Sequence, residues 1–293
     1  MNSKLHSSVS IPQSQKSNIN SSQPQNPRQT QQPLDVGEFE FWYQPTYQVR
    51  SYNVLHNEVL LRWRDRPGKV YLPDEFIPVL AEMGLLYHLD RYVISKGIDR
   101  LVSQPQLYLS INLSPLVFED YTLIEDLDSW LSETQIDPKR LCFELTELTI
   151  AEQFITALNF IQNLRNLGCL VVIDNFTGKE LTLSQCQQLP VNLVKLDRQF
   201  LKSIKANPEN VALVKQLREI KSIMGQVVVK YVEDEQTLEC VEQMNLDAVQ
   251  GNLLQLPDET PQLQTWVNPF LEELPYNYLE FTLGDRSSSG LKF

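Results

Sequence analysis

The alternation that reveals the architecture is clearest in LCFELTELTIAEQFITALNFIQNLRNLGCLVVIDN, residues 141–175. Apolar runs at 141–147 and 169–175 flank a segment, 150–168, whose apolar residues recur at helical spacing. Short apolar runs are typical of buried strands, and a glycine such as Gly168 commonly ends a helix. The stretch therefore predicts a strand, a helix and a second strand.

The same alternation extends over most of the chain. Further strands are predicted at 38–45, 58–63, 107–113, 193–198, 226–232 and 248–254, and helices at 74–84, 85–102, 209–225 and 235–244. Repeated strand–helix–strand units build a parallel sheet with right-handed crossovers. An open doubly wound sheet and a closed (β/α)8 barrel both fit this order. The chain has no G-x-G-x-x-G after its first strand and no G-x-x-x-x-G-K, which disfavours nucleotide-binding forms of the open sheet.

Polar side chains recur in or at the C-terminal ends of the predicted strands. They are Glu58, Asn112, Glu144, Asp174, Lys195 and Lys230. Barrel active sites assemble on this face, so the placement favours the closed barrel. Carboxylates and an amide suit Mg²⁺ or Mn²⁺, and a lysine among them suits a phosphate, which together suggest metal-assisted attack on a phosphate ester. Each acid taken singly could equally cap a helix or pair with a neighbour.

Composition limits the classes of partner and the compartment. The 293 residues are 42% hydrophobic and carry a net charge of −12, with a pI of about 4.8. Such an acidic surface repels phosphate backbones, so we expect no nucleic-acid partner. The four cysteines form no C-x-x-C pair, and no apolar run reaches the length of a membrane span or a signal core. We therefore expect a cytoplasmic protein with no membrane span.

Three regions are predicted along the chain. Residues 1–37 are rich in Ser, Gln, Asn and Pro, a composition typical of a disordered tail. The barrel is expected over 38–260. Residues 261–293 form a C-terminal extension of unknown role, in which YLEFTL (278–283) could add a short strand.

Several motifs occur along the chain in a characteristic order. They are YQP (43–45), NEVLLRW (57–63), PDEFIPVLAEMGL (73–85), INLS (111–114), FELTE (143–147), VIDNF (172–176), VKLDRQF (194–200) and D-x-x-Q-G (247–251). In this order they resemble the EAL domain family of cyclic di-GMP phosphodiesterases, over about residues 38–257. The resemblance implies an α/β fold, a (β/α)8 TIM-like barrel of the EAL type.

The resemblance also implies a role for each matching residue. Four positions match the family's metal ligands: Glu58, Asn112, Glu144 and Asp174. Lys195 matches the lysine that activates the attacking water, and Arg62 matches the arginine that contacts the dinucleotide phosphate. Glu147 matches the glutamate that steadies the loop after the metal-binding strand. Glu233 and Gln250 match late residues of the pocket, one supporting the metal site and one near the water.

The chain departs from the family at positions that bear on catalysis. Asn175 replaces an aspartate that binds the second metal, Lys230 replaces a catalytic glutamate, and Tyr231 replaces a glycine. Loop glycines are replaced by Thr177 and Lys179. An ammonium about 6 Å from a divalent metal repels it by about 5 kcal/mol at an effective dielectric of about 20, roughly three to four orders of magnitude in affinity. The resemblance therefore implies weak or absent metal binding and no residue that is active in catalysis.

We therefore expect a degenerate EAL barrel that acts as a cyclic di-GMP receptor, needs no cofactor and signals through a protein effector. The expected binding residues are Arg62, Glu58, Asn112, Asp174, Lys195, Lys230, Tyr231 and Gln250. Lys230 could bind the ligand phosphate or could pair with Glu144 or Glu58 as a relic. Tyr231 could stack on a guanine or fill the pocket.

Two other functions remain open at this point. The first is a ligand-independent protein-interaction scaffold, which the altered loop at 177–183 favours. The second is a slow phosphodiesterase that uses Mg²⁺ or Mn²⁺. A homodimer is also open, because the family often dimerises through the helix that follows the metal-binding loop.

Overall fold

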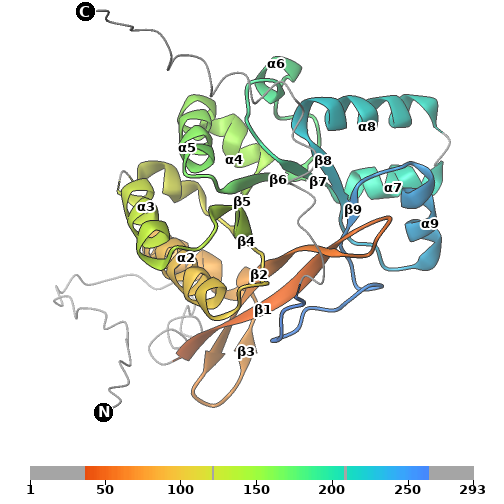
Figure 1. The fold of residues 1–293 in the computed structure, drawn as a ribbon. Coiled ribbons are helices and arrows are strands. Elements are labelled where there is room, and N and C mark those ends of the chain that lie inside the picture. The colour runs from red at the N-terminus through yellow and green to blue at the C-terminus, as the bar shows by residue number, and fades with distance from the viewer. Residues whose placement is uncertain (1–36, 121, 208–209, 264–293) are drawn as a thin grey trace, which may run out of the picture.

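The computed structural model of the chain describes residues 37–120, 122–207 and 210–263 (Figure 1). Residues 1–36 of the tail predicted over 1–37 lie outside these residues, as does the strand considered at 278–283, whereas Gly37 begins a strand. Within the described residues the chain forms one closed ring of strands with helices around it (Figure 1). The predicted (β/α)8 barrel is confirmed.

Eight strands form the ring. They are β1 (Gly37–Gln48), β2 (Val54–Asp65), β4 (Leu109–Asn112), β5 (Leu141–Thr146), β6 (Leu170–Phe176), β7 (Leu193–Leu196), β8 (Gln226–Val229) and β9 (Ala248–Val249). The strands from β2 to β9 pair in parallel around the ring, whereas β1 pairs antiparallel with both β2 and β9 and closes it. The short strand β3 (Val70–Tyr71) extends β2 outside the ring. The antiparallel β1 departs from the all-parallel prediction because a short turn can join only antiparallel strands.

Nine α-helices are described around the ring. They are α1 (Pro73–Glu82), α2 (Leu86–Ser103), α3 (Leu123–Thr134), α4 (Glu147–Glu152), α5 (Phe154–Asn166), α6 (Leu183–Cys186), α7 (Arg198–Ala206), α8 (Val211–Met224) and α9 (Glu235–Gln243). The pattern at 150–168 falls on α4 and α5, which Gln153 separates. The sequence reading missed α3, α6 and α7. Gly225 ends α8 at φ +86°, where a Cβ would lie 2.4 Å from the Asn192 carbonyl oxygen, so this turn requires glycine.

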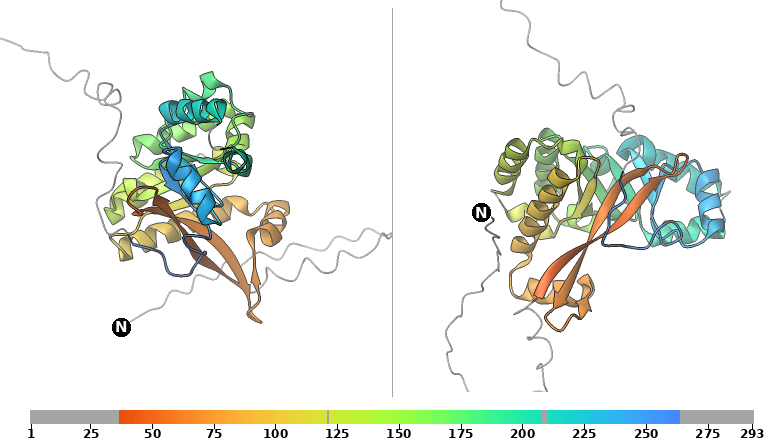
Figure 2. Two further views of the ribbon diagram at one scale, coloured as in Figure 1. Left: turned by 90° about the vertical axis from the view of Figure 1, so that its right-hand side faces the viewer. Right: turned by 60° about the horizontal axis from the view of Figure 1, so that its bottom comes forward.

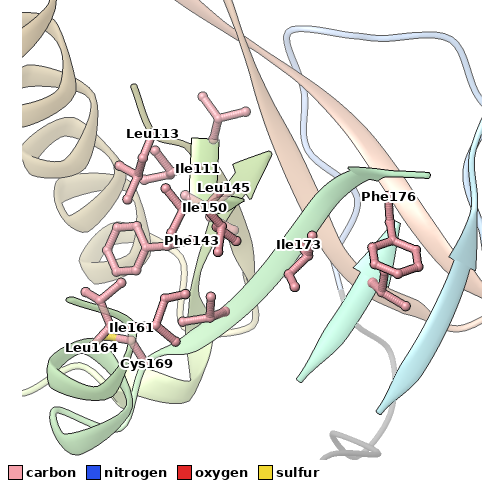
Figure 3. Packing of buried hydrophobic residues seen from close by; sticks show 14 of the residues in the cluster. Ile111, Leu113, Phe143, Leu145, Ile150, Ile161, Leu164, Cys169, Ile173 and Phe176 are labelled. Atoms are coloured by element: carbon pink, nitrogen blue, oxygen red, sulfur yellow. The ribbon is translucent and has the colours of Figure 1, made fainter. Parts of the chain in front are cut away.

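Figure 3 shows how the outer faces of the strands pack against the helices. Phe143 and Leu145 of β5 and Ile173 of β6 lie with Ile150 and Ile161 of the neighbouring helices, and all five side chains are fully buried. Each such side chain stabilises the fold by about 1.5–3 kcal/mol relative to exposure. This packing fixes the direction of β5 and β6, and therefore the place of the polar residues on their opposite faces.

The inner faces of the strands form two layers. The lower layer is a separate apolar cluster: Leu55, Cys142, Leu170, Val172, Leu193, Val228 and Ala248. Residues two positions apart on a strand share a face. The next inward position along five strands is therefore polar. These residues and Glu58 of β2, which bonds to Lys195, form the upper layer: Glu58, Glu144, Asp174, Lys195, Lys230 and Gln250.

Candidate functional site

A buried lysine joins two acids in the centre of the upper layer. The Lys195 ammonium donates to Glu58 Oε2 at 2.6 Å and to Glu144 Oε1 at 2.5 Å. Lys195 is fully buried, and Glu144 is 1% exposed. A charge at this depth is tolerated only when it is paired and hydrogen-bonded, so the three side chains act as one unit.

Two amides complete the surroundings of Glu58. Asn112 Nδ2 donates to Glu58 Oε1 and Gln250 Nε2 donates to Glu58 Oε2, both at 2.9 Å. Every oxygen of this carboxylate is therefore occupied by a donor within the chain. The structure thus brings together four residues that the sequence placed in or at the ends of separate strands, Glu58, Asn112, Glu144 and Lys195, and Gln250, which the resemblance placed in the pocket.

Lys230 lies at the carboxyl end of β8 and pairs with residues of β6. Its ammonium donates to Asp174 Oδ1 at 2.6 Å and to Asn175 Oδ1 at 2.8 Å, and the residue is 9% exposed. The strand ends at Val229, so Lys230 follows it rather than interrupting it. The partner is Asp174, and not Glu144 or Glu58 as one reading of the sequence proposed.

The charges of this cluster set its protonation. Burial acts to raise the pKa of Glu58, but the ammonium groups of Lys195 and Lys230 outweigh it and hold the pKa below its usual range. Burial, with the neighbouring Glu58 charge, raises the pKa of Glu144 to about 7. Glu58 is therefore ionised at neutral pH, while Glu144 takes up a proton more readily than an exposed glutamate does.

Both lysines keep their protons. Burial acts to lower the pKa of Lys195, but Glu144 and Glu58 outweigh it and raise the pKa. Burial likewise opposes the charge of Asp174 at Lys230, where the net direction of the pKa is also upward. The upper layer therefore holds two permanent cations.

A cleft of about 340 Å³ opens above this layer. Its floor includes Glu58, Lys230 and Gln250, and its lining continues to Tyr231 and Glu233. Further lining residues were missed by the sequence reading: Gln44, Leu60, Arg198, Gly251 and Asn252. The position of Arg198, two residues after β7, is a strand-end signal of the kind that identified the other residues.

The lining of the cleft includes a stacked pair. The Arg198 guanidinium lies 4.5 Å from the centre of the Tyr231 ring, and its Nη2 is 3.7 Å from Glu233 Oε1. Tyr231 has φ +63°, a left-handed conformation in which a side chain is strained. The chain therefore holds Tyr231 in a backbone state suited to the glycine of the family pattern.

Arg62 lies apart from this lining. Its Nη1 donates to the Leu61 carbonyl oxygen at 2.8 Å, and its guanidinium lies 5.5 Å from the Trp42 ring. Arg62 shares a face of β2 with Glu58 and Leu60, which both line the cleft. The phosphate contact implied for Arg62 stays a prediction.

Glu147 holds the loop that follows β6. Its Oε2 accepts from the Thr177 and Gly178 amides and from the Thr177 hydroxyl at 2.6–3.2 Å, while Oε1 accepts from the Glu180 and Leu181 amides at 3.3 Å. The residue is 1% exposed. A buried carboxylate with this many donors needs no metal to hold its loop, so the loop keeps its anchor despite its altered sequence.

The donor set does not fit a divalent metal in this arrangement. Within residues 37–120, 122–207 and 210–263, no three His, Cys, Asp or Glu side chains form a group able to hold a metal ion. Lys195 lies between Glu58 and Glu144, and Lys230 holds Asp174. Each of the three candidate carboxylates therefore already faces a cation of the chain itself, and the Asn112 amide donates to Glu58.

Fold and site together define an α/β barrel with a polar cleft at the carboxyl ends of its strands. The model of the EAL domain family matches residues 28–257, and the chain belongs to this family. No helix in the described part of the chain is long and apolar enough to cross a membrane.

Curated relatives carry the same domain. The chain is 29% identical over 249 residues to the cyclic di-GMP phosphodiesterase PdeF of Escherichia coli, covering 83% of this chain and 33% of PdeF. It is 29% identical over 230 residues to the cyclic di-GMP phosphodiesterase RocR of Pseudomonas aeruginosa, covering 76% and 58%. The chain thus spans a third to three fifths of the length of these two relatives.

Solved structures share the fold. The EAL domain of FimX from Pseudomonas aeruginosa, bound to cyclic di-GMP, superposes with a TM-score of 0.70 at 27% identity, over 76% of this chain and 91% of that domain. The MucR phosphodiesterase in complex with cyclic di-GMP gives 0.68 at 23% identity, over 75% and 92%. At that lower identity the likeness concerns the fold alone.

Proposed function

We propose that this chain binds cyclic di-GMP without hydrolysing it and acts as a receptor that signals to a protein effector. The observation that carries the proposal is the Lys230 ammonium, which bonds to Asp174 and Asn175 and also lines the cleft. A cation of the chain therefore lies against Asp174, the residue that the resemblance matches to a metal ligand of the family. A ligand with two phosphate charges can bind such a cation directly.

The charge balance of the upper layer supports metal-free binding. Its three acids, Glu58, Glu144 and Asp174, face two ammonium groups, and proton uptake by Glu144 brings the sum from −1 to 0. If the chain carried the family's residues, Asp at 175 would change the net charge of the site by −1 and Glu at 230 would change it by −2. The total change would be −3. Such a layer needs added cations before it can accept an anion, whereas the present one does not.

The relatives support the ligand class. The FimX EAL domain is bound to cyclic di-GMP. PdeF and RocR are both named as cyclic di-GMP phosphodiesterases. Loss of turnover rests on this chain's own residues, because Asp174 is engaged by Lys230 and position 175 offers an amide in place of a carboxylate. A cytoplasmic location and the protein effector are parts of the same proposal.

A calorimetric titration of cyclic di-GMP into the full chain with EDTA present tests the proposal. We expect binding in the low-micromolar range or tighter. Lys230→Met should weaken it at least tenfold, because the variant removes the cation but keeps most of the side-chain length. The matched control is Lys205→Met, an exposed lysine of α7 that pairs with Asp234 on the surface. Unchanged affinity in Lys230→Met would contradict the proposal.

A ligand-independent scaffold is the second candidate function. The Arg198–Tyr231 stack favours it, since both side chains occupy the lining of the cleft that a guanine would enter. On this alternative no heat is observed with or without added Mn²⁺. Binding that appears only in Tyr231→Gly would show that the ring excludes the ligand.

A further inference from the structure

A second groove lies on the outside of the barrel, along β1. It has a volume of about 360 Å³ and is lined by aromatic residues of β1 and by α2, chiefly Phe39, Phe41, Tyr43, Tyr92, Lys96 and Arg100. The three aromatic residues of β1 share one face of the strand, and Gln44, which lines the cleft inside the ring, lies on the other face. The groove therefore lies on the outer face of the strand, opposite to the candidate ligand site.

The topology explains why this face is open. Every parallel crossover in the ring carries at least one helix, which covers the outer faces of the strands it joins. The connection from β1 to β2 is a turn, so it brings no helix to lie over β1. In the right-hand view of Figure 2 the β1–β2 ribbon crosses the front of the molecule, with no described helix in front of it.

The chemistry of the groove is aromatic and cationic. Phe39 lies 5.9 Å from the Tyr92 ring, and Phe41 lies 6.5 Å from the Tyr43 ring. Arg100 Nε donates to the Tyr43 hydroxyl at 3.1 Å, and Lys96 is 3.3 Å from Asp99. Two cations and one acid leave a net positive charge, which is unusual on a chain of net charge −12. Such a groove suits a segment that carries aromatic and acidic side chains together.

The described chain ends beside this groove. Asp258 forms an antiparallel bridge with Tyr43, the amide and carbonyl of each bonding to the other at 2.7 and 3.0 Å. Gln262 is then held by the Asn57 side chain through two hydrogen bonds of 2.8 and 2.9 Å. The next segment is therefore delivered to the outer surface of β1 and β2.

The sequence that follows has the complementary composition. Residues 270–281 read FLEELPYNYLEF, with three glutamates, four aromatic residues and no lysine or arginine. Seven residue steps separate Leu263 from Phe270 and can span up to about 23 Å. The groove follows β1 from Phe39 to Tyr43, four steps or about 13 Å. We propose that residues 270–281 bind in this groove, between the outer face of β1 and the side of α2.

Hydrogen exchange of the full chain, read on peptides from 270–281, tests the proposal. We expect amide exchange at least tenfold slower than the rate for an unstructured peptide of the same sequence. Phe41→Ser and Lys96→Glu should each return exchange toward that rate. Glu280→Lys combined with Lys96→Glu should restore part of the protection, because it reverses both charges. Lys202→Glu, at an exposed lysine of α7, is the matched control and should change nothing.

Three outcomes would overturn the proposal. One is unprotected exchange over 270–281 in the unmodified chain. Another is protection that neither Phe41→Ser nor Lys96→Glu reduces, which would mean that the segment binds elsewhere. Lys96 is exposed, so Lys96→Glu keeps the groove testable even if Phe41→Ser fails to fold. Protection that depends on protein concentration and on the groove would indicate that the segment docks on a second copy, which contradicts docking within one chain.

Discussion

The two layers of the barrel interior differ in what holds them together. The lower layer is apolar and closed, with Cys142, Val172 and Val228 each at most 2% exposed. The upper layer, two residues further along the same strands, consists of acids paired with lysines. The apolar layer depends on filled volume, whereas each paired charge of the upper layer depends on its partner. Asn175 and Lys230 bear on the upper layer and leave the residues of the lower one untouched.

The largest effect is expected from breaking the central ion group. Lys195→Met removes the ammonium and leaves Glu58 and Glu144 facing each other without a cation. Losing one partner of a buried ion pair costs about 3–5 kcal/mol. We expect urea unfolding at pH 8 to show a loss of that size.

Protonation of Glu144 should reduce the destabilisation caused by Lys195→Met. At pH 5.5 Glu144 can take up a proton in the variant, so the destabilisation should be smaller than at pH 8. Lys205→Met serves as the control and should change stability little, because its ion pair is exposed. Equal losses in both lysine variants would remove the distinction between buried and surface charge.

A lower-layer variant should affect stability but not the ligand site. Val172→Ala deletes two methyl groups from a fully buried side chain, a loss of about 2 kcal/mol through transfer and cavity terms. Cyclic di-GMP affinity, measured by calorimetry at a temperature where both proteins are folded, should stay within about twofold. A tenfold loss of affinity would show that the two layers are coupled.

The pH dependence of stability offers a finer test of the upper layer. The pKa of Glu144 is raised to about 7 in the folded chain from an ordinary value of 4.5. The folded state therefore binds this proton more tightly, and the contribution to stability is lost as pH rises from about 5 to 7, at no more than about 1.4 kcal/mol per pH unit. Glu144→Gln should remove this slope in urea unfolding curves.

The difference in stability between the unmodified chain and Glu144→Gln separates the contribution of Glu144 from that of a buried histidine. Burial and the charge of Lys195 lower the pKa of His56 to about 3. The contribution of His56 to the stability of the chain is therefore lost as pH falls below about 6.5, which is opposite to the pH dependence expected from Glu144. This slope is present in both proteins and cancels in the difference. A difference that does not vary with pH would contradict the raised pKa of Glu144.

The sequence was informative where local pattern and position agree. The strand–helix alternation predicted the barrel, and the polar strand ends predicted which side chains converge on Glu58. Position along a strand decides this convergence, because inward residues of adjacent parallel strands meet at the same level. For this reason Asn112 and Lys195 could be placed from the strand pattern, whereas Gln250 was placed by the resemblance to the family.

Features that depend on contacts between distant segments could not be read in the same way. The pairing of Lys230 with Asp174 is set by the relative height of β6 and β8, which no local pattern encodes. Arg198, whose place after β7 is a readable strand-end signal, was overlooked, whereas the antiparallel β1 depends on the turn between two strands. The outer groove likewise arises from the missing crossover helix and not from a motif.

The measurement that tests the central claim most directly is the affinity for cyclic di-GMP with EDTA and with Mn²⁺, in the natural chain and in the double variant Asn175→Asp, Lys230→Glu. The account predicts equal affinities under both conditions for the natural chain, because Lys230 supplies the cation. It predicts at least tenfold tighter binding with Mn²⁺ for the double variant, whose upper layer gains three negative charges. A natural chain that binds only with Mn²⁺ would contradict the account.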